Sequence, residues 1–201
     1  MKTNKEHIQR LVGTAILAAI VIVLQTFLVI PLGPFTVTLT LVPIMLGAIL
    51  FGPSAGAFLG GVFGITVSVQ VVTGAAGIFS YMMFEQNPVL TIFICLLKGI
   101  VAGLVSGLIY KLFSKKEKKA IGTVLSAVAC PICNTGIFAI ALMVFYNSLT
   151  LNFATENTSY TNVYLFILFG MIGLNFVVEF VINVLLIPVI LRIIHAVKTK
   201  A

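Results

Sequence analysis

The segment Leu46-Gly-Ala-Ile-Leu-Phe-Gly-Pro-Ser-Ala-Gly56 interrupts an apolar stretch that runs from residue 37 to residue 72. The stretch is long enough for two membrane-spanning helices, because each needs about 20 mostly apolar residues. A Gly-Pro pair inside apolar sequence ends one helix and begins the next, with the proline at an early helical position. The segment therefore predicts a tight hairpin of two helices, the first of them short.

Four further apolar segments flank this hairpin, and each is long enough to span a bilayer. They cover residues 8–30, 89–113, 121–146 and 163–194. The first segment ends at Pro31-Leu-Gly-Pro34, which predicts a rigid turn. Polar loops are expected at residues 73–88 and 147–162.

The sequence thus predicts an all-α membrane protein, with one six-helix integral membrane domain that covers residues 1–201. Pro131 is expected to bend the fifth helix, because proline removes a backbone hydrogen bond from the helix interior. Pro188 is expected to distort the end of the unusually long last helix for the same reason.

The composition excludes a soluble globular domain. Hydrophobic residues make up 60% of the chain and charged residues 8%, with a mean hydropathy of +1.21, whereas an average soluble domain is about 25% charged. Eleven of the twelve Lys and Arg residues lie at the N-terminus, at 111–119 and at 192–200. Cytoplasmic loops carry such an excess of positive charge, so both termini are expected in the cytoplasm. The net charge of +7 then indicates contact with the bilayer surface rather than with nucleic acid.

The twelfth basic residue, Lys98, lies inside a predicted span, about 15 Å below its outer end at 1.5 Å per residue. Glu179 is the one acid inside a predicted span, and its depth differs from that of Lys98 by about 8 Å. Charges at such depths are costly and mark ion pairs or functional sites. Two interpretations stay open: Lys98 pairs structurally with Glu179, or Lys98 receives an anionic ligand group in a cavity open to the outside.

Amide side chains at membrane depth form a second group of candidates. Asn175 and Glu179 are one turn apart on the last helix, Asn183 continues this row, and Asn134 lies at mid-depth on the fifth helix. Such amides either hold helices together or line a small polar pocket. We expect Asn134 and Asn175 to line a pocket together with Gln70, and Asn183 to hold helices together.

The outer loop around residues 79–88 is rich in aromatic residues and methionine, and it contains Tyr81 and Asn87. This composition predicts either an anchor at the membrane interface or a lid over a ligand. As parts of a lid, Tyr81 and Asn87 are candidate substrate-binding residues.

Signatures of enzymes and of metal sites are absent from the sequence. It contains no Asp, no His inside a predicted span, and no Walker, H-E-x-x-H or G-x-S-x-G motif. We therefore expect no catalysis, no cofactor and no metal site, and no coupling to ATP by this chain alone. Cys130 and Cys133 form a C-x-x-C pair in an apolar segment without a second ligand pair, which favours packing.

Small residues form two regular rows. Ala15-x-x-x-Ala19 is a flat stripe on the first helix, and the second row is Gly52-x-x-x-Gly56-x-x-x-Gly60-x-x-x-Gly64. Rows of this kind let helices approach closely. They predict either packing within the chain or a face that slides against a partner protein.

Six helices in 201 residues, the Ala15-x-x-x-Ala19 stripe and the segment from Leu46 to Gly56 together resemble the substrate-binding S components of energy-coupling factor (ECF) vitamin transporters. The resemblance covers nearly the whole chain. It implies a subunit of the prokaryotic cell membrane that captures a vitamin from outside with high affinity. The pocket would lie in its outer half, built by the last three helices and the outer loops.

The same resemblance implies partners. A membrane coupling protein and two cytoplasmic ATPases would supply the energy, and the S component would reorient in the membrane to deliver its ligand. Ala15 and Ala19 would meet the coupling protein, with Gly56 and Gly60 of the neighbouring helices beside them.

Among S components, the chain looks most like those assigned to pantothenate, on the Leu46–Gly56 pattern, Asn134 and Asn175-x-x-x-Glu179. A carboxylate suits Lys98, while hydroxyls and an amide suit Asn134, Asn175 and Glu179. The absence of Trp argues against thiamin or a flavin, because flat aromatic ligands favour stacking.

Alternatives remain for the ligand and for the function. Riboflavin, folate and a pyridoxine or pyrimidine precursor are the other ligands, although the two carboxylates of folate favour more than one buried cation. The other function is a stand-alone secondary carrier or channel for a small anionic or polar metabolite. It predicts transport by the chain alone and an internal repeat, and no convincing repeat is present.

Overall fold

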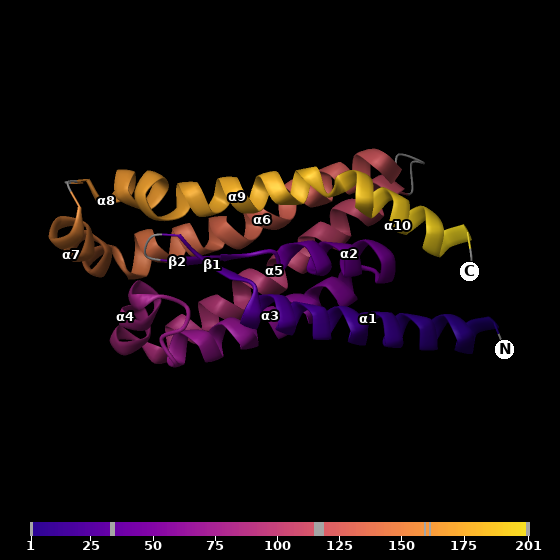
Figure 1. Cartoon of the computed structure of the whole chain (residues 1–201), viewed down its shortest axis with the longest axis horizontal. Coiled ribbons are helices and arrows are strands. Elements are labelled where there is room, and N and C mark those ends of the chain that lie inside the picture. Colours follow the sequence, from indigo (N-terminus) through magenta and orange to yellow (C-terminus); the bar gives the residue numbers. More distant parts are fainter. Residues whose placement is uncertain (1, 33–34, 115–118, 159, 161, 200–201) are drawn as a thin grey trace.

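The computed structural model describes residues 2–32, 35–114, 119–158, 160 and 162–199, and it is nearly all helical (Figure 1). In chain order its elements are α1 (Lys2–Phe27), β1 (Val29–Leu32), β2 (Phe35–Thr38), α2 (Leu41–Phe51), α3 (Pro53–Val72), α4 (Ile78–Gln86), α5 (Pro88–Ser114), α6 (Lys119–Phe145), α7 (Asn147–Asn157), α8 (Val163–Leu165), the π-helix η1 (Phe166–Ile172), α9 (Gly173–Leu185) and α10 (Ile187–Thr199).

Four helical segments of the described chain are long and apolar enough to cross a bilayer by themselves: His7–Phe27 of α1, and the whole of α3, α5 and α6. A fifth candidate is the bent segment in which α8 and η1 are followed by α9. Helix α2 is apolar but has only 11 residues, about 16 Å at 1.5 Å per residue, against a hydrocarbon core of about 30 Å. A nearly all-helical fold with several apolar helices is therefore confirmed, while the sixth span stays a prediction.

The helix hairpin expected at the Gly-Pro pair is present. α2 ends at Phe51 and α3 begins at Pro53, and Gly52 between them has a φ of +97°. Residues with a Cβ rarely adopt this region, and proline suits the first helical position because the N–H that it lacks would have no partner there. The local sequence thus sets both the end of α2 and the start of α3.

Helices α3 and α5 pack backbone against backbone. A Cβ added to Gly60 would meet the carbonyl oxygen of Gly99, and a Cβ added to Gly56 would meet that of Gly103. Gly56 and Gly60 are buried, so packing within the chain, one of the two interpretations above, accounts for both. They are covered by α5, and we therefore do not include them in the partner surface to which the sequence had assigned them.

Replacing Gly60 with alanine is expected to destabilise the protein, because the new methyl group would lie against the Gly99 backbone rather than against a movable side chain. Overpacking of this kind costs about 1–3 kcal/mol. Gly136 on α6 offers a matched control, since a Cβ there meets nothing within 4 Å. In thermal unfolding of the detergent-solubilised protein, Gly60→Ala should unfold at a lower temperature than Gly136→Ala. Equal temperatures would contradict the close α3–α5 contact.

The two loops expected at 73–88 and 147–162 each contain a helix, so these predictions were wrong over most of their length. α4 begins after Gly77, whose φ is +100°, and it ends just before Asn87. α7 fills most of the second segment. Polar composition marks the end of an apolar span, but it does not exclude a short helix with one buried face.

A small β-hairpin, which was not among the elements expected from the sequence, lies between α1 and α2. β1 and β2 are antiparallel and pair from Val29↔Thr38 to Leu32↔Phe35. Their composition, rich in Val, Ile, Thr and Phe, favours strands. Helix α2 consequently begins at Leu41 rather than near residue 37. Gly33 and Pro34 of the predicted rigid turn lie outside the described residues.

The last apolar segment departs from a continuous α-helix at two places. The first is the π-helix η1, and the second is Leu186, which separates α9 from α10. Pro188 is the second residue of α10, directly after this break, so the helix is interrupted beside Pro188 as expected. Pro131 lies inside α6, which continues across it.

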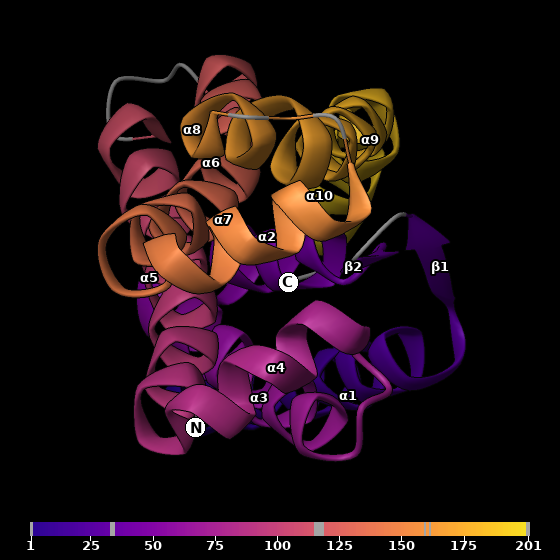
Figure 2. The same ribbon diagram turned by 90° about the vertical axis from the view of Figure 1, so that its left-hand side faces the viewer.

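The two ends of the bundle differ in charge. α4 and α7 lie together at one end, while α1 begins and α10 ends at the opposite one (Figure 1). Figure 2 looks onto the first end, where α4 and α7 cross in front of the long helices. Glu85 belongs to α4 and Glu156 to α7, whereas Arg10 belongs to α1 and Arg192 to α10. The fold thus keeps the basic clusters at one end of the bundle, while the orientation expected from them stays a prediction.

Candidate functional site

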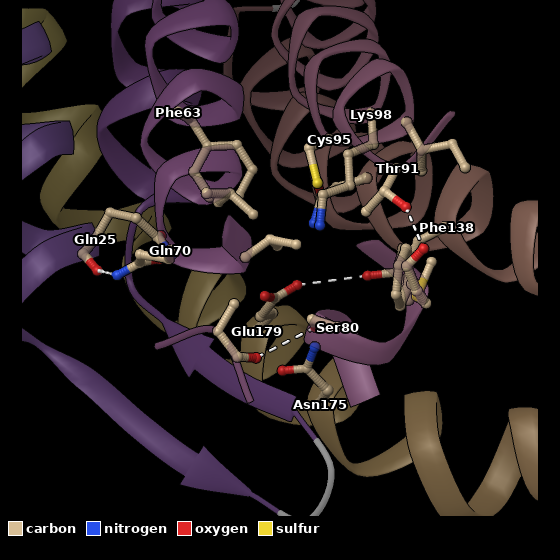
Figure 3. Close-up of a pocket in the computed structure, with 17 residues that line it drawn as sticks. Gln25, Phe63, Gln70, Ser80, Thr91, Cys95, Lys98, Phe138, Asn175 and Glu179 are labelled. Atoms are coloured by element: carbon tan, nitrogen blue, oxygen red, sulfur yellow. Dashed lines mark hydrogen bonds between the residues drawn. The ribbon is translucent and has the colours of Figure 1, made fainter. Parts of the chain in front are cut away.

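A cavity lies between α1, α3, α4, α5, α6 and α9, and the α4 residues that line it place it toward the α4 end of the bundle (Figure 3). Its polar lining consists of Gln25, Gln70, Ser80, Thr91, Lys98, Asn134, Thr135, Asn175 and Glu179. Its remaining lining consists of Phe63, Val67, Val71, Ala76, Met83, Ile94, Cys95 and Phe138. Five of the candidate residues from four separate helices thus meet at one place: Gln70, Lys98, Asn134, Asn175 and Glu179.

Lys98 extends from α5 into this cavity (Figure 3). Its Nζ atom lies 4.8 Å from the ring centroid of Phe138 and 5.8 Å from that of Phe63. The negative face of an aromatic ring attracts an ammonium group, so the two rings hold the cation in place without neutralising it. The ring pair was not predicted, because Phe63 and Phe138 are far apart in the sequence and form no motif.

Glu179 enters the same cavity from α9 and is 7% exposed. The Thr135 hydroxyl donates a hydrogen bond to Glu179 Oε2 at a long distance of 3.5 Å (Figure 3). Within the described part of the chain, neither Lys98 nor Glu179 takes part in an ion pair within 4.0 Å. The structural pair considered above is therefore not formed, although both charges face one cavity.

Two asparagines present unpaired oxygen atoms at this site. The Oδ1 atoms of Asn134 and Asn175 are buried without a hydrogen-bond partner among the described residues, and both residues line the cavity. A buried acceptor without a donor costs about 1–3 kcal/mol, so both positions favour a ligand that brings O–H or N–H groups. Asn183 is not part of the lining, and its Nδ2 donates to the backbone oxygen of Glu179 within α9 at 2.8 Å. Its Oδ1 is also buried without a partner among the described residues, so its expected role in holding helices together stays a prediction.

Gln70 lines the cavity, but its amide bonds within the protein. Gln25 Nε2 donates to Gln70 Oε1 at 2.8 Å, and Gln70 Nε2 donates to the backbone oxygen of Gln25 at 2.6 Å. Thr40 Oγ1 donates to Gln25 Oε1 at 2.9 Å. These bonds join α1, α3 and the residue before α2, and they close one side of the cavity. Gln25 was not among the predicted residues, although its amide inside a predicted span is the same signal that indicated Gln70.

Tyr81 and Asn87 lie outside the cavity lining. Tyr81 is 38% exposed on α4, where a hydrogen bond to the Glu85 carboxylate raises the pKa of its hydroxyl. Asn87 Oδ1 accepts a hydrogen bond from Leu90 N at 3.1 Å and caps α5. The lining residues of this region are instead Ser80, Met83 and Thr91. We therefore do not include Tyr81 and Asn87 in the proposed site.

Residues 9–191 match the family model described as the substrate-specific component of an ECF transporter. The chain belongs to this family. This S component is 30% identical over 148 residues to a protein of Lactococcus lactis subsp. cremoris (strain MG1363) named pantothenic acid transporter PanT. The match covers 67% of this chain and 72% of PanT.

The structure of the S component resembles that of ThiT from Listeria monocytogenes, with a TM-score of 0.60 over 94% of this chain and 98% of ThiT. At 20% sequence identity, this similarity concerns the fold alone. Membership of the family confirms the resemblance inferred from the sequence. It also confirms a multi-pass membrane protein that serves transport and is not an enzyme.

Proposed function

We propose that this S component captures pantothenate from outside the cell and delivers it through an ATP-driven importer. The observation that carries the proposal is the combination in one cavity of the Lys98 ammonium with the two unpaired amide oxygens of Asn134 and Asn175. These groups favour a ligand that is an anion and also carries hydrogen-bond donors. The similarity to PanT supports the same ligand.

Pantothenate meets these demands group by group. Its single carboxylate matches the single ammonium of the described lining. Its two hydroxyls and its amide N–H supply donors for the oxygens of Asn134 and Asn175. Its dimethyl-substituted carbon suits the apolar wall that Val67, Val71 and Ile94 form. Polar groups would orient the ligand and the apolar wall would cover its dimethyl-substituted carbon, and small-molecule sites commonly combine the two.

The proposed orientation has both termini and the loop between α5 and α6 in the cytoplasm. The basic clusters support it through the positive-inside rule, and so does the gathering of the chain ends at one end of the bundle (Figure 1). The α4 and α7 end then faces outward in a prokaryotic cell membrane. In this orientation, with α2 as a short sixth span, the cavity would lie in the outer half of the membrane.

The proposed partners are a membrane coupling protein and two cytoplasmic ATPases, and we assign the coupling surface to Ala15 and Ala19. Both alanines are exposed on α1 and line a groove between α1 and α3 with Arg10, Ser54 and Phe58. Arg10 donates a hydrogen bond to Ser54 across this groove. Small residues on its wall would let a partner helix approach closely.

Calorimetric titration of the purified, detergent-solubilised chain with pantothenate tests the proposal. We expect binding without any partner protein, with a dissociation constant in the nanomolar range. Mass spectrometry of small molecules released from the purified chain identifies the ligand independently. Another vitamin in that experiment would keep the mechanism and overturn the ligand.

A transport assay tests the need for partners. Cells that contain the S component without the coupling protein and ATPases should not take up labelled pantothenate, and cells that contain all of them should. Uptake by the chain alone would favour a stand-alone carrier and contradict the proposal.

A further inference from the structure

The charges in the cavity do not balance once an anionic ligand enters. Among the described lining residues only Lys98 and Glu179 carry a charge, so the ligand-free site holds one cation and one potential anion. A bound carboxylate brings a second anion to the same ammonium. An ionised site would then carry a net negative charge in the interior of the membrane.

The other groups that face Glu179 offer little compensation. From α6, the Thr135 hydroxyl donates one long hydrogen bond, and the Cys130 thiol is within electrostatic reach. From α5, the facing groups are Lys98 and the Cys95 thiol. The α1, α3 and α4 side chains of the lining are uncharged, and α9 adds only Asn175 beside Glu179 itself. An ionised carboxylate with so few partners is costly at this depth.

Two carboxylates that share one buried site cannot both remain ionised at low cost. Lys98 is the only cation of the described lining, so the ligand carboxylate pairs with it and stays ionised. Glu179 is then the group that loses its charge. We propose that each pantothenate anion is captured together with one proton, which comes from the external solution and binds to the Glu179 carboxylate. This inference rests on the proposed function, and it adds a second ligand to the same site.

The occupied site is then neutral, with one ammonium, one ligand carboxylate and one uncharged carboxyl group. The protonated Glu179 has an O–H group, which can donate a hydrogen bond to a carbonyl or hydroxyl oxygen of the ligand. A neutral occupied cavity also suits a subunit that reorients within lipid, because net charge in hydrocarbon is costly.

Calorimetry in buffers that differ in ionisation enthalpy, such as phosphate and Tris at about pH 8, where Glu179 of the empty site is mostly ionised, counts the protons taken up on binding. For the wild-type S component with pantothenate, the observed heat should depend on the buffer with a slope of about one proton taken up per ligand bound. Since the occupied state holds more protons than the empty one, the dissociation constant should rise with pH, by up to about tenfold per pH unit once Glu179 of the empty site is ionised. An uptake below about half a proton per ligand would overturn the inference.

Two substitutions locate the proton. Glu179→Gln removes the acceptor, so any heat of pantothenate binding by this variant should no longer depend on the buffer. Glu156→Gln, at an exposed position on α7 outside the cavity, should keep the wild-type uptake. Continued uptake in Glu179→Gln would mean that Lys98 takes the proton, and it would overturn the inference.

The wild-type titration decides the matter even where Glu179→Gln does not fold. If the heat of pantothenate binding does not depend on the buffer, the uptake of a proton with the ligand is contradicted and the proposed function stands. No heat with pantothenate in any buffer contradicts the proposed function itself.

Discussion

Replacing Lys98 with methionine is expected to weaken pantothenate binding by at least about 30-fold, because removing one partner of a buried charge pair costs about 2–5 kcal/mol or more. Lys98 is the only cation in the described lining of the cavity. Methionine keeps a long apolar stem against the rings of Phe63 and Phe138, which flank the ammonium. The loss therefore reports the charge rather than the packing, and calorimetric titration measures it.

Two comparisons make this result specific. Lys111→Met removes a charge from an exposed position near the end of α5, and it should leave the dissociation constant unchanged. Pantothenyl alcohol lacks the carboxylate, so the preference of the wild type for pantothenate over this alcohol should disappear in Lys98→Met. A dissociation constant of Lys98→Met within about threefold of the wild type would contradict the assignment.

The stability of the same variant tests the finding that Lys98 forms no structural pair with Glu179. An unpaired cation at membrane depth is costly, so its removal should leave the ligand-free protein as stable as the wild type, or more so. Loss of folded protein would mean instead that Lys98 and Glu179 stabilise the bundle together. Thermal unfolding without ligand gives this answer.

The long helices could be predicted from the sequence, because the length of an apolar segment indicates whether it spans the bilayer, and a Gly-Pro pair marks where one helix ends and the next begins. α5 and α6 begin and end within two residues of the expected bounds. α4, α7 and the β-hairpin could not be predicted in this way. They are short, and their stability comes from contacts with other elements, such as Phe79 of α4 against Phe153 of α7 at 5.1 Å between ring centroids.

Apart from Gln25, the charged and amide residues of the site could be predicted for a related reason. Lys98, Asn134 and Glu179 stand out because such groups are costly in an apolar span. Serine, threonine and phenylalanine are ordinary there, so Thr135 and Phe138 carried no signal until the fold placed them beside Glu179 and Lys98.

Replacing Ala19 with tryptophan is expected to abolish pantothenate uptake and to leave pantothenate binding intact. Ala19 is exposed on α1, in the groove and outside the cavity lining. A partner helix can approach a small-residue stripe closely, and an indole at its centre would hold the coupling protein away. Uptake of labelled pantothenate by cells with all partners measures the first effect, and titration of the purified variant measures the second.

The matched control places the same indole on another face. Val124 is 41% exposed on α6 and lines neither the groove nor the cavity, so Val124→Trp should transport at the wild-type rate. Co-purification of the coupling protein should fall for Ala19→Trp and not for Val124→Trp. Wild-type uptake by Ala19→Trp would exclude this face as the coupling surface. If Ala19→Trp loses both pantothenate binding and uptake, the indole disturbs the fold, because a surface that contacts only the partner protein has no contact with the ligand.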